Sequence, residues 1–233
     1  MLTEEVHHLS VGEKGIGRVV QRTAQLMKAS PNEDVRASGG IPLEIIQKYL
    51  NYWYSYSLDL FGGEISSNSA DFFAAGLKGR YEEQKKYEDH LATEGSYSIE
   101  VMEDGHLRFK EVPLRNALNE VLRNEYGKDC ERGLARWNKI LAAEDIAERL
   151  YLPSRRFHRH VGAYAGYCFD VLGNVSLADE FTQRSDDWLP TLADREYVQS
   201  LMSPVTAPRE IANWIAPPPI GVNHLPFAFE YVR

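Results

Sequence analysis

The chain has 233 residues, of which 43% are hydrophobic and 26% charged, enough for one or two domains with a sizeable core. The formal net charge of −8 argues against a nucleic-acid partner, because phosphate binding needs a basic surface. Two cysteines, Cys130 and Cys168, suit a reducing compartment rather than a disulfide framework. No apolar run approaches the roughly 20 residues that span a bilayer. The N-terminus shows no signal-peptide pattern, so we expect a cytoplasmic protein without a membrane segment.

The first predicted element is a helix over residues 1–29. One stripe of this helix is apolar except for a carboxylate and a hydroxyl, and it comprises Leu2, Glu5, Leu9, Ile16, Val20, Thr23 and Met27. His8 lies along the edge of this stripe, three residues after Glu5, so the two side chains are neighbours on the helix surface. Burying both against a helical core is costly unless a charged group, such as a metal ion, lies between them. Glu5 and His8 are therefore predicted metal ligands, a pair of the kind used by ferritin-like di-iron bundles, and a chance match is the alternative.

The pattern stays helical up to about residue 95. A loop rich in turn formers, residues 29–42, leads to an aromatic-rich helix over 43–61. Aromatic residues at this spacing are typical of a core, and a cofactor pocket is the alternative. A further helix, with charges on one face, is predicted over residues 64–92.

From residue 96 the chain mixes strands and helices. The alternation around Asp104 and Gly105 predicts a β-hairpin over residues 96–113. The later predicted elements are a helix over 114–145, a second hairpin over 155–177 that turns at Gly173 and Asn174, short helices over 178–188 and 191–202, and an irregular tail. The predicted fold is mainly α, with part of a helical bundle in residues 1–95 and an α+β region with two hairpins in residues 96–233.

A basic cluster lies in residues 155–160. Arg155, Arg156 and Arg159 supply guanidinium groups there, which suit an anionic ligand such as the phosphates of a coenzyme. The alternative is a charged edge strand that discourages aggregation. The three arginines are therefore candidate substrate-binding residues.

Three long segments of the chain carry a resemblance to a known family. They are MLTEEVHHLSVGEKGIGRVVQRT, IQKYLNYWYSYSLDLFGGEISSNSADFFAAGLKGRYEE and NWIAPPPIGVN, the last followed by the terminal FEYVR. In this order and with similar gaps, they resemble the oxygenase component, component B, of benzoyl-coenzyme A 2,3-epoxidases. The resemblance runs through all 233 residues but covers only the C-terminal half or so of that family.

The resemblance implies a ferritin-like di-iron monooxygenase of aerobic aromatic degradation. That family converts benzoyl-coenzyme A to its 2,3-epoxide with O₂, taking electrons from NADPH through a separate reductase component. Glu5 and His8 match the second of the two Glu-x-x-His motifs that hold its iron pair. The first motif and two single carboxylates have no counterpart in this chain, so we expect a fragment that is inactive without the missing N-terminal half. The resemblance also makes the aromatic helix a candidate pocket wall and Arg155, Arg156 and Arg159 candidate contacts to the coenzyme A phosphates.

Two other classes of function stay open at this stage. The chain could be a non-catalytic helical protein in which Glu5 and His8 store or buffer a metal. It could also be an interaction module without a metal, in which the apolar face of residues 2–27 docks a partner chain.

Overall fold

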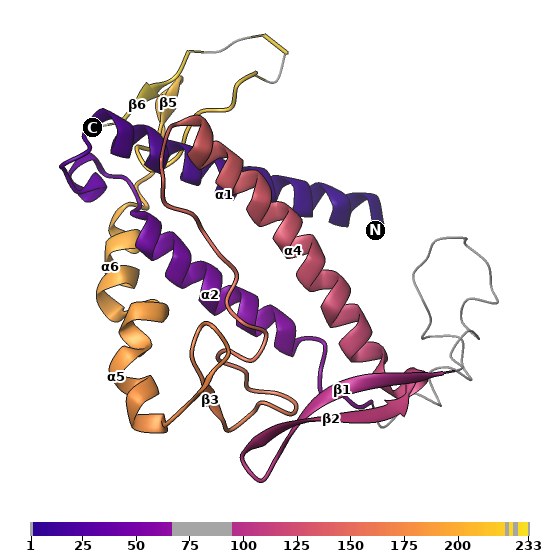
Figure 1. Ribbon diagram of the computed structural model, residues 1–233. Coiled ribbons are helices and arrows are strands. Elements are labelled where there is room, and N and C mark those ends of the chain that lie inside the picture. Colours follow the sequence, from indigo (N-terminus) through magenta and orange to yellow (C-terminus); the bar gives the residue numbers. More distant parts are fainter. Residues whose placement is uncertain (1, 67–94, 222–223, 226–227, 233) are drawn as a thin grey trace. The chain divides into compact units, whose positions relative to one another are not determined.

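The computed structural model describes residues 2–66, 95–221, 224–225 and 228–232 (Figure 1). Most of the helix predicted over residues 64–92 lies outside these described residues. The described part is mainly α with small two-stranded sheets, as the sequence predicts. Among the helices that the structure describes, none is long and apolar enough to cross a membrane.

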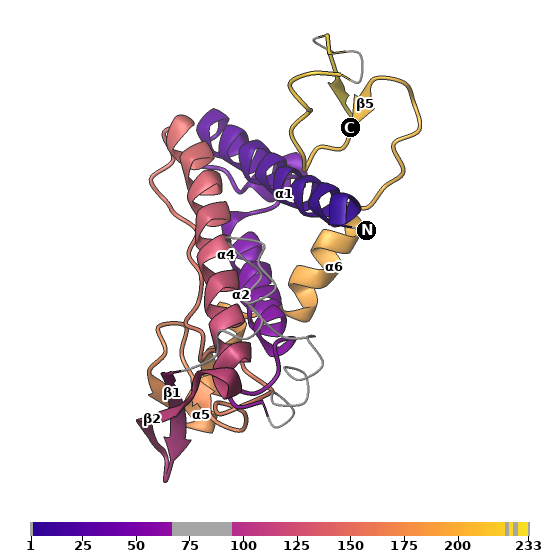
Figure 2. The ribbon, with the colours of Figure 1, turned by 90° about the vertical axis from the view of Figure 1, so that its right-hand side faces the viewer.

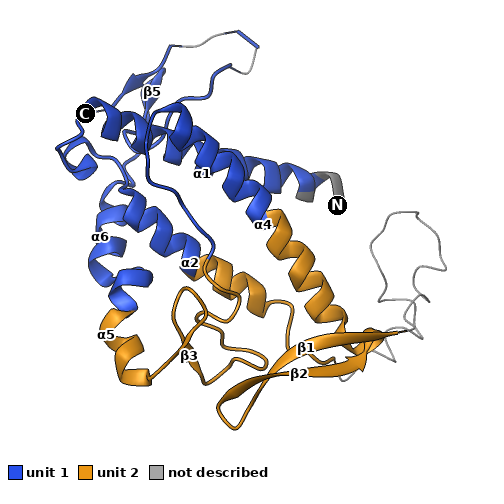
Figure 3. Cartoon of the chain, viewed as in Figure 1, with its two compact units in different colours: residues 1–51, 130–152, 185–233 blue, residues 52–129, 153–184 orange. Residues whose placement is uncertain are grey.

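The chain forms two compact units, each built from separate stretches of sequence (Figure 3). Unit 1 comprises Met1–Asn51, Cys130–Leu152 and Ser185–Arg233, and unit 2 comprises Tyr52–Asp129 and Pro153–Arg184. The predicted division between residues 95 and 96 stays a prediction.

The predicted helices form close to their expected bounds. They are α1 (Leu2–Ala29), α2 (Leu43–Asp59), α4 (Leu118–Ala143), α5 (Ala178–Trp188) and α6 (Leu192–Ser200). A 3₁₀ turn, Leu114–Ala117, precedes α4, and another, Val35–Ser38, follows α1. Helix α6 begins with a capping box, in which the side chains of Thr191 and Asp194 each bond the other's backbone N–H.

The core of unit 1 lies where α1 packs against α2 and against the part of α4 within this unit, residues 130–143 (Figure 2). The buried apolar side chains are Val19, Val20, Ala24, Ile41, Ile45, Ile46, Leu141, Ile146 and Leu150. Thr23 is also fully buried, and its hydroxyl donates to the carbonyl of Ile41 at 2.6 Å. The second half of the predicted α1 stripe is therefore buried, as expected. The first half is not, because Leu9 is 74% exposed and Ile16 43% exposed in this chain.

The hairpin predicted around Asp104 and Gly105 is confirmed in unit 2. Strands β1 (Ser96–Glu103) and β2 (His106–Pro113) pair antiparallel over their whole length. Both turn residues have positive φ, 52° at Asp104 and 77° at Gly105, as a two-residue hairpin turn of type I′ requires. One face of the hairpin buries Ile99 and Val112 against the first turn of the following helical segment.

The second hairpin is much shorter than predicted. Only β3 (Cys168–Phe169) and β4 (Val175–Ser176) pair, although the turn between them falls at the expected place. The Asp170 carboxylate closes this turn by accepting bonds from the backbone N–H groups of Leu172 and Asn174. Residues 155–167 form turns because their arginines bind scattered carboxylates and because Gly162 and Gly166 have positive φ.

The tail holds one element that the sequence did not predict. Strands β5 (Glu210–Ile211) and β6 (Glu230–Tyr231) pair in parallel. The Arg22 guanidinium of α1 lies 3.7 Å from the centre of the Tyr231 ring, a cation–π contact that holds this pair against the helix.

Candidate functional site

Helix α1 is held along its second half and presents its first turns to solvent. The tail binds it from one side, where Arg18 donates to the carbonyl of Ala216 at 2.6 Å and Arg22 to that of Asn213 at 2.8 Å. Before Glu13, the described side chains of α1 are exposed except for the half-buried Ser10. The helix therefore carries the predicted metal ligands on an anchored but accessible end.

The backbone of Glu5 and the whole of His8 lie on this accessible end. The His8 side chain is exposed, whereas the side chain of Glu5 lies outside what the structure describes. Because both residues belong to one continuous helix, their Cα atoms are about 4.5 Å apart along its axis and about 60° apart around it. That placement suits two ligands of one ion.

A di-iron site would need more ligands than Glu5 and His8. In the described ranges, no group of three or more His, Cys, Asp or Glu side chains is placed to hold a metal ion. Two irons need more carboxylates and imidazoles than one Glu-x-x-His pair supplies. Glu5 and His8 alone therefore do not complete such a site, and any further ligands would lie outside the described residues.

The three candidate arginines lie close together in unit 2, and each meets a carboxylate. Arg155 donates to Glu120 at 3.0 Å, and Arg156 donates to Glu100 at 3.1 Å. Arg159 donates to Asp59 at 2.5 Å, and its side chain has no exposed surface. Arg155 keeps the most exposure, at 43% of its side chain, so it is the arginine of this cluster best placed to meet a phosphate.

A buried ion cluster that the sequence analysis missed lies beside these arginines. Arg123 is 1% exposed and binds two buried carboxylates, Glu64 at 3.2 Å and Glu120. It also donates to the backbone carbonyls of Leu58 and Gly62. The spacing of Glu120 and Arg123 in a helix is a signal that could have suggested a pair, but nothing local marks Glu64 as the second partner.

His158 lies at an aromatic corner of unit 2. Its ring centre is 4.6 Å from that of His160 and 6.0 Å from that of Tyr56. Its Nδ1 atom is buried without a hydrogen-bond partner. Burial, with the neighbouring His160, lowers the pKa of His158 to about 4, although Asp59 opposes the shift. The imidazole is therefore neutral at physiological pH.

This lowered pKa predicts a loss of stability in mild acid. Between about pH 6.5 and about pH 4, the unfolded chain binds a proton at His158 that the folded chain does not. We therefore expect the free energy of unfolding to fall as the pH is lowered through this window, measured by urea denaturation. The variant His158→Asn should flatten the dependence, since asparagine tolerates the left-handed backbone at φ 50°. An unchanged pH dependence in this variant would contradict the assignment.

The aromatic helix has two different faces within unit 2. Tyr54 and Leu58 are buried, as expected of core residues, whereas Trp53 is 61% exposed and Leu60 is 87% exposed. A recess of about 200 Å³ lies beside Leu60, lined also by Ser57, Phe61 and Tyr126. The prediction that this aromatic helix forms a pocket wall stays a prediction.

The structure is that of a mainly α protein, and its candidate metal ligands are the carboxylate of Glu5 and the imidazole of His8 on α1. No model of a known protein family matches the chain. The chain is 44% identical over 236 residues to a protein named Benzoyl-CoA oxygenase component B, from Aromatoleum evansii. The match covers all of this chain and 50% of the relative, so the chain is a homologue that spans about half of the relative's length. This confirms the resemblance to component B and is consistent with a match to its C-terminal portion.

Proposed function

We propose that this chain forms the C-terminal part of the oxygenase component of a benzoyl-coenzyme A epoxidase. The observation that carries the proposal is the identity of 44%, sustained over the whole chain, to a benzoyl-CoA oxygenase component B. The Glu5-x-x-His8 spacing on α1, where the His8 side chain is exposed, supports it, because an oxygenase needs a site that activates O₂. The reaction would place one oxygen atom of O₂ across the 2,3 bond of the aromatic ring and release the other as water. NADPH would supply the electrons through a separate reductase component.

Glu5 and His8 would contribute two of the ligands of a di-iron centre, which supplies the activation of O₂ when bound. The Glu5 carboxylate would offset part of the positive charge of the metal. His8 would bind as a neutral imidazole, with its second ring nitrogen held by a hydrogen-bond acceptor. The remaining ligands would come from the half of the protein that the relative has in addition to the matched region. The isolated chain is therefore inactive in this proposal.

The exposed apolar residues of α1 would bind this other half. Val6, Leu9, Val11 and Ile16 are between 43% and 74% exposed on the first turns of the helix. Leu9 and Ile16 share the stripe that carries Glu5, so covering this stripe with a second helical segment would also enclose the metal ligands. Enclosure would keep water away from the oxidant and from the aromatic ring.

The experiment that tests the proposal is a product analysis. The chain would be co-expressed with a polypeptide equivalent to the other half of the relative, and supplied with benzoyl-coenzyme A, the reductase, NADPH and isotopically labelled O₂. We expect a product that carries a single labelled oxygen atom as a ring epoxide. A product without label, or one with both labelled atoms, would contradict the proposed reaction.

A docking module without chemistry is the second candidate, favoured by the exposed apolar residues on α1. In that case, replacing Glu5 and His8 would leave the affinity of the chain for its partner polypeptide unchanged. The complex would contain no iron. A protein that only stores metal would instead bind iron without oxidising benzoyl-coenzyme A. Iron content and product analysis on the same complex therefore separate the three readings.

A further inference from the structure

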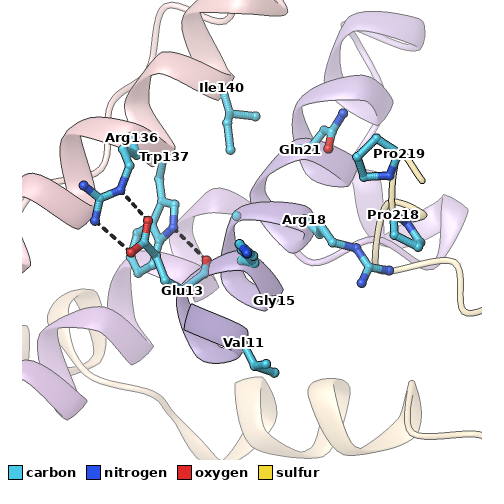
Figure 4. A pocket seen from close by; sticks show the side chains of 12 residues that line it. Val11, Glu13, Gly15, Arg18, Gln21, Arg136, Trp137, Ile140, Pro218 and Pro219 are labelled. Atoms are coloured by element: carbon cyan, nitrogen blue, oxygen red, sulfur yellow. Dashed lines mark hydrogen bonds and ion pairs between the residues drawn. The ribbon is translucent and has the colours of Figure 1, made fainter. Parts of the chain in front are cut away.

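A pocket in the described part of unit 1 lies between the middle of α1, residues 136–140 of α4, and two prolines of the tail (Figure 4). Its volume of about 570 Å³ is in the range of small-molecule sites. The apolar part of its lining comes from Val11, Trp137, Ile140, Pro218 and Pro219. Neither the proposed metal site nor the arginine cluster uses this pocket.

The floor of the pocket contains two helical glycines whose presence costs stability. Glycine in a helix interior is about 1 kcal/mol less favourable than alanine. Gly17 has a packing reason, since an added Cβ would lie 3.4 Å from Ile140 and 3.5 Å from Trp137. Gly15 has none, because an added Cβ would meet nothing within 4 Å. The absence of a side chain at Gly15 therefore keeps space open rather than allowing close packing.

The polar groups of the pocket favour an anionic ligand. Arg136 donates two hydrogen bonds to the Glu13 carboxylate, one at 2.7 Å, so these two charges offset each other. The positive charges of Lys14 and Arg18 are then not offset by another carboxylate of the pocket lining. The two residues are four positions apart on one helix, where like charges are slightly unfavourable without a ligand. The pocket thus carries a net charge of about +2 in a chain of formal charge −8.

One flat side chain gives the pocket a surface for an aromatic base. The Trp137 indole is fixed by its Nε1 atom, which donates to the Glu13 carbonyl at 3.2 Å (Figure 4). Gln21 adds an amide that both donates and accepts hydrogen bonds. An aromatic wall, an amide and two unmatched cations match the parts of a phosphorylated nucleoside.

We propose that this pocket binds the adenosine 3′,5′-bisphosphate end of a coenzyme A thioester, with Lys14 and Arg18 facing its phosphates. The inference rests on the proposed function, which supplies coenzyme A as the carrier of the substrate. A coenzyme A thioester has its acyl group and its nucleotide at opposite ends of a long flexible arm. Along α1, Arg18 is about 15 Å from His8, so one helix would serve both ends of the molecule.

The test uses adenosine 3′,5′-bisphosphate and isothermal titration calorimetry on the full chain. Gly15→Leu fills the pocket and should raise helix stability, and Lys14→Ala removes one cation. Each change should weaken binding by about tenfold or more. The matched control is Gly12→Leu, also a helical glycine with open space around it but outside the pocket lining, and it should leave the affinity unchanged. Circular dichroism of each variant checks that the helix content is kept.

A second control separates this pocket from the arginine cluster of unit 2. A loss of affinity for the bisphosphate in Arg155→Ala would place the phosphates at the arginine cluster instead of the pocket. Absence of binding by the unaltered chain, or binding that depends on Arg155 and not on Gly15 and Lys14, would overturn the inference. Failure of the proposed function looks different, since the pocket would then bind the bisphosphate while the assembled protein formed no oxygenated product. If the assembled enzyme is active and Gly15→Leu leaves its KM for benzoyl-coenzyme A unchanged, the assignment of the pocket is wrong while the proposed function stands.

Discussion

Replacing His8 by alanine in the assembled oxygenase is expected to abolish both iron loading and turnover. Changes to groups that merely orient a metal ligand cost roughly 10–100-fold in metal affinity, and the loss of a ligand itself should cost more. Glu5→Ala should have the same effect, because it removes the carboxylate of the same helical turn. The measurements are iron content per complex and the rate of product formation from benzoyl-coenzyme A.

The neighbouring Glu4 and His7 provide a matched control. They have the same Glu-x-x-His spacing on the same helix, but each lies one residue earlier, so the pair is rotated by about 100° around the helix from Glu5 and His8. Glu4→Ala and His7→Ala should therefore retain iron and activity. Wild-type turnover in Glu5→Ala, or equal losses in both pairs of variants, would end the assignment of Glu5 and His8 as ligands.

Replacing Arg123 by methionine should strongly destabilise unit 2. The change leaves Glu64 and Glu120 buried without their shared cation, and breaking a buried ion pair in this way typically costs about 3–5 kcal/mol. Two backbone carbonyls, those of Leu58 and Gly62, also lose their donor. The free energy of unfolding from urea denaturation measures the effect.

An exposed arginine of the same unit gives the comparison. Arg108 is 59% exposed and lies 3.9 Å from Glu103, so Arg108→Met should change the stability by less than about 1 kcal/mol. Adding Glu64→Gln to Arg123→Met should restore part of the loss, because Glu64 is the carboxylate that keeps no other cation among the described residues and its buried charge is then gone. Similar losses for Arg123→Met and Arg108→Met would show that the buried cluster contributes little.

The sequence predicted those features that depend on nearby residues. The turn at Asp104 and Gly105 follows from a dipeptide that tolerates positive φ, and the β1–β2 hairpin follows from the turn. Helix α1 follows from its continuous pattern over 28 residues. The resemblance, which rests on long segments in order, was confirmed by the identity to component B.

The features that the sequence analysis missed depend on residues far apart in the chain. The sequence left Arg159 available for a phosphate, but its Nε atom donates to Asp59, 100 positions earlier, and its terminal nitrogens donate to backbone carbonyls. Glu64 meets Arg123 across 59 positions. The pocket on α1 requires Pro218 and Pro219, about 200 residues after Gly15 in the sequence. Spacing within one helix or strand carries no information about such partners.

The apolar stripe of α1 shows how a correct pattern can be only partly realised in one chain. Val20 and Thr23 are buried by groups within unit 1, whereas Leu9 on the same stripe is exposed. The pattern specifies a face that is to be covered, and the described residues cover its second half. The proposed partner polypeptide would cover the rest and complete the metal site.

The most direct test of this account is the number of irons held by the chain alone and by the chain assembled with a polypeptide equivalent to the other half of the relative. After reconstitution with ferrous iron and removal of loosely bound metal, we expect two irons in each assembled complex and no tightly bound pair in the isolated chain. Two tightly held irons in the isolated chain, or an assembled complex without iron, would contradict it.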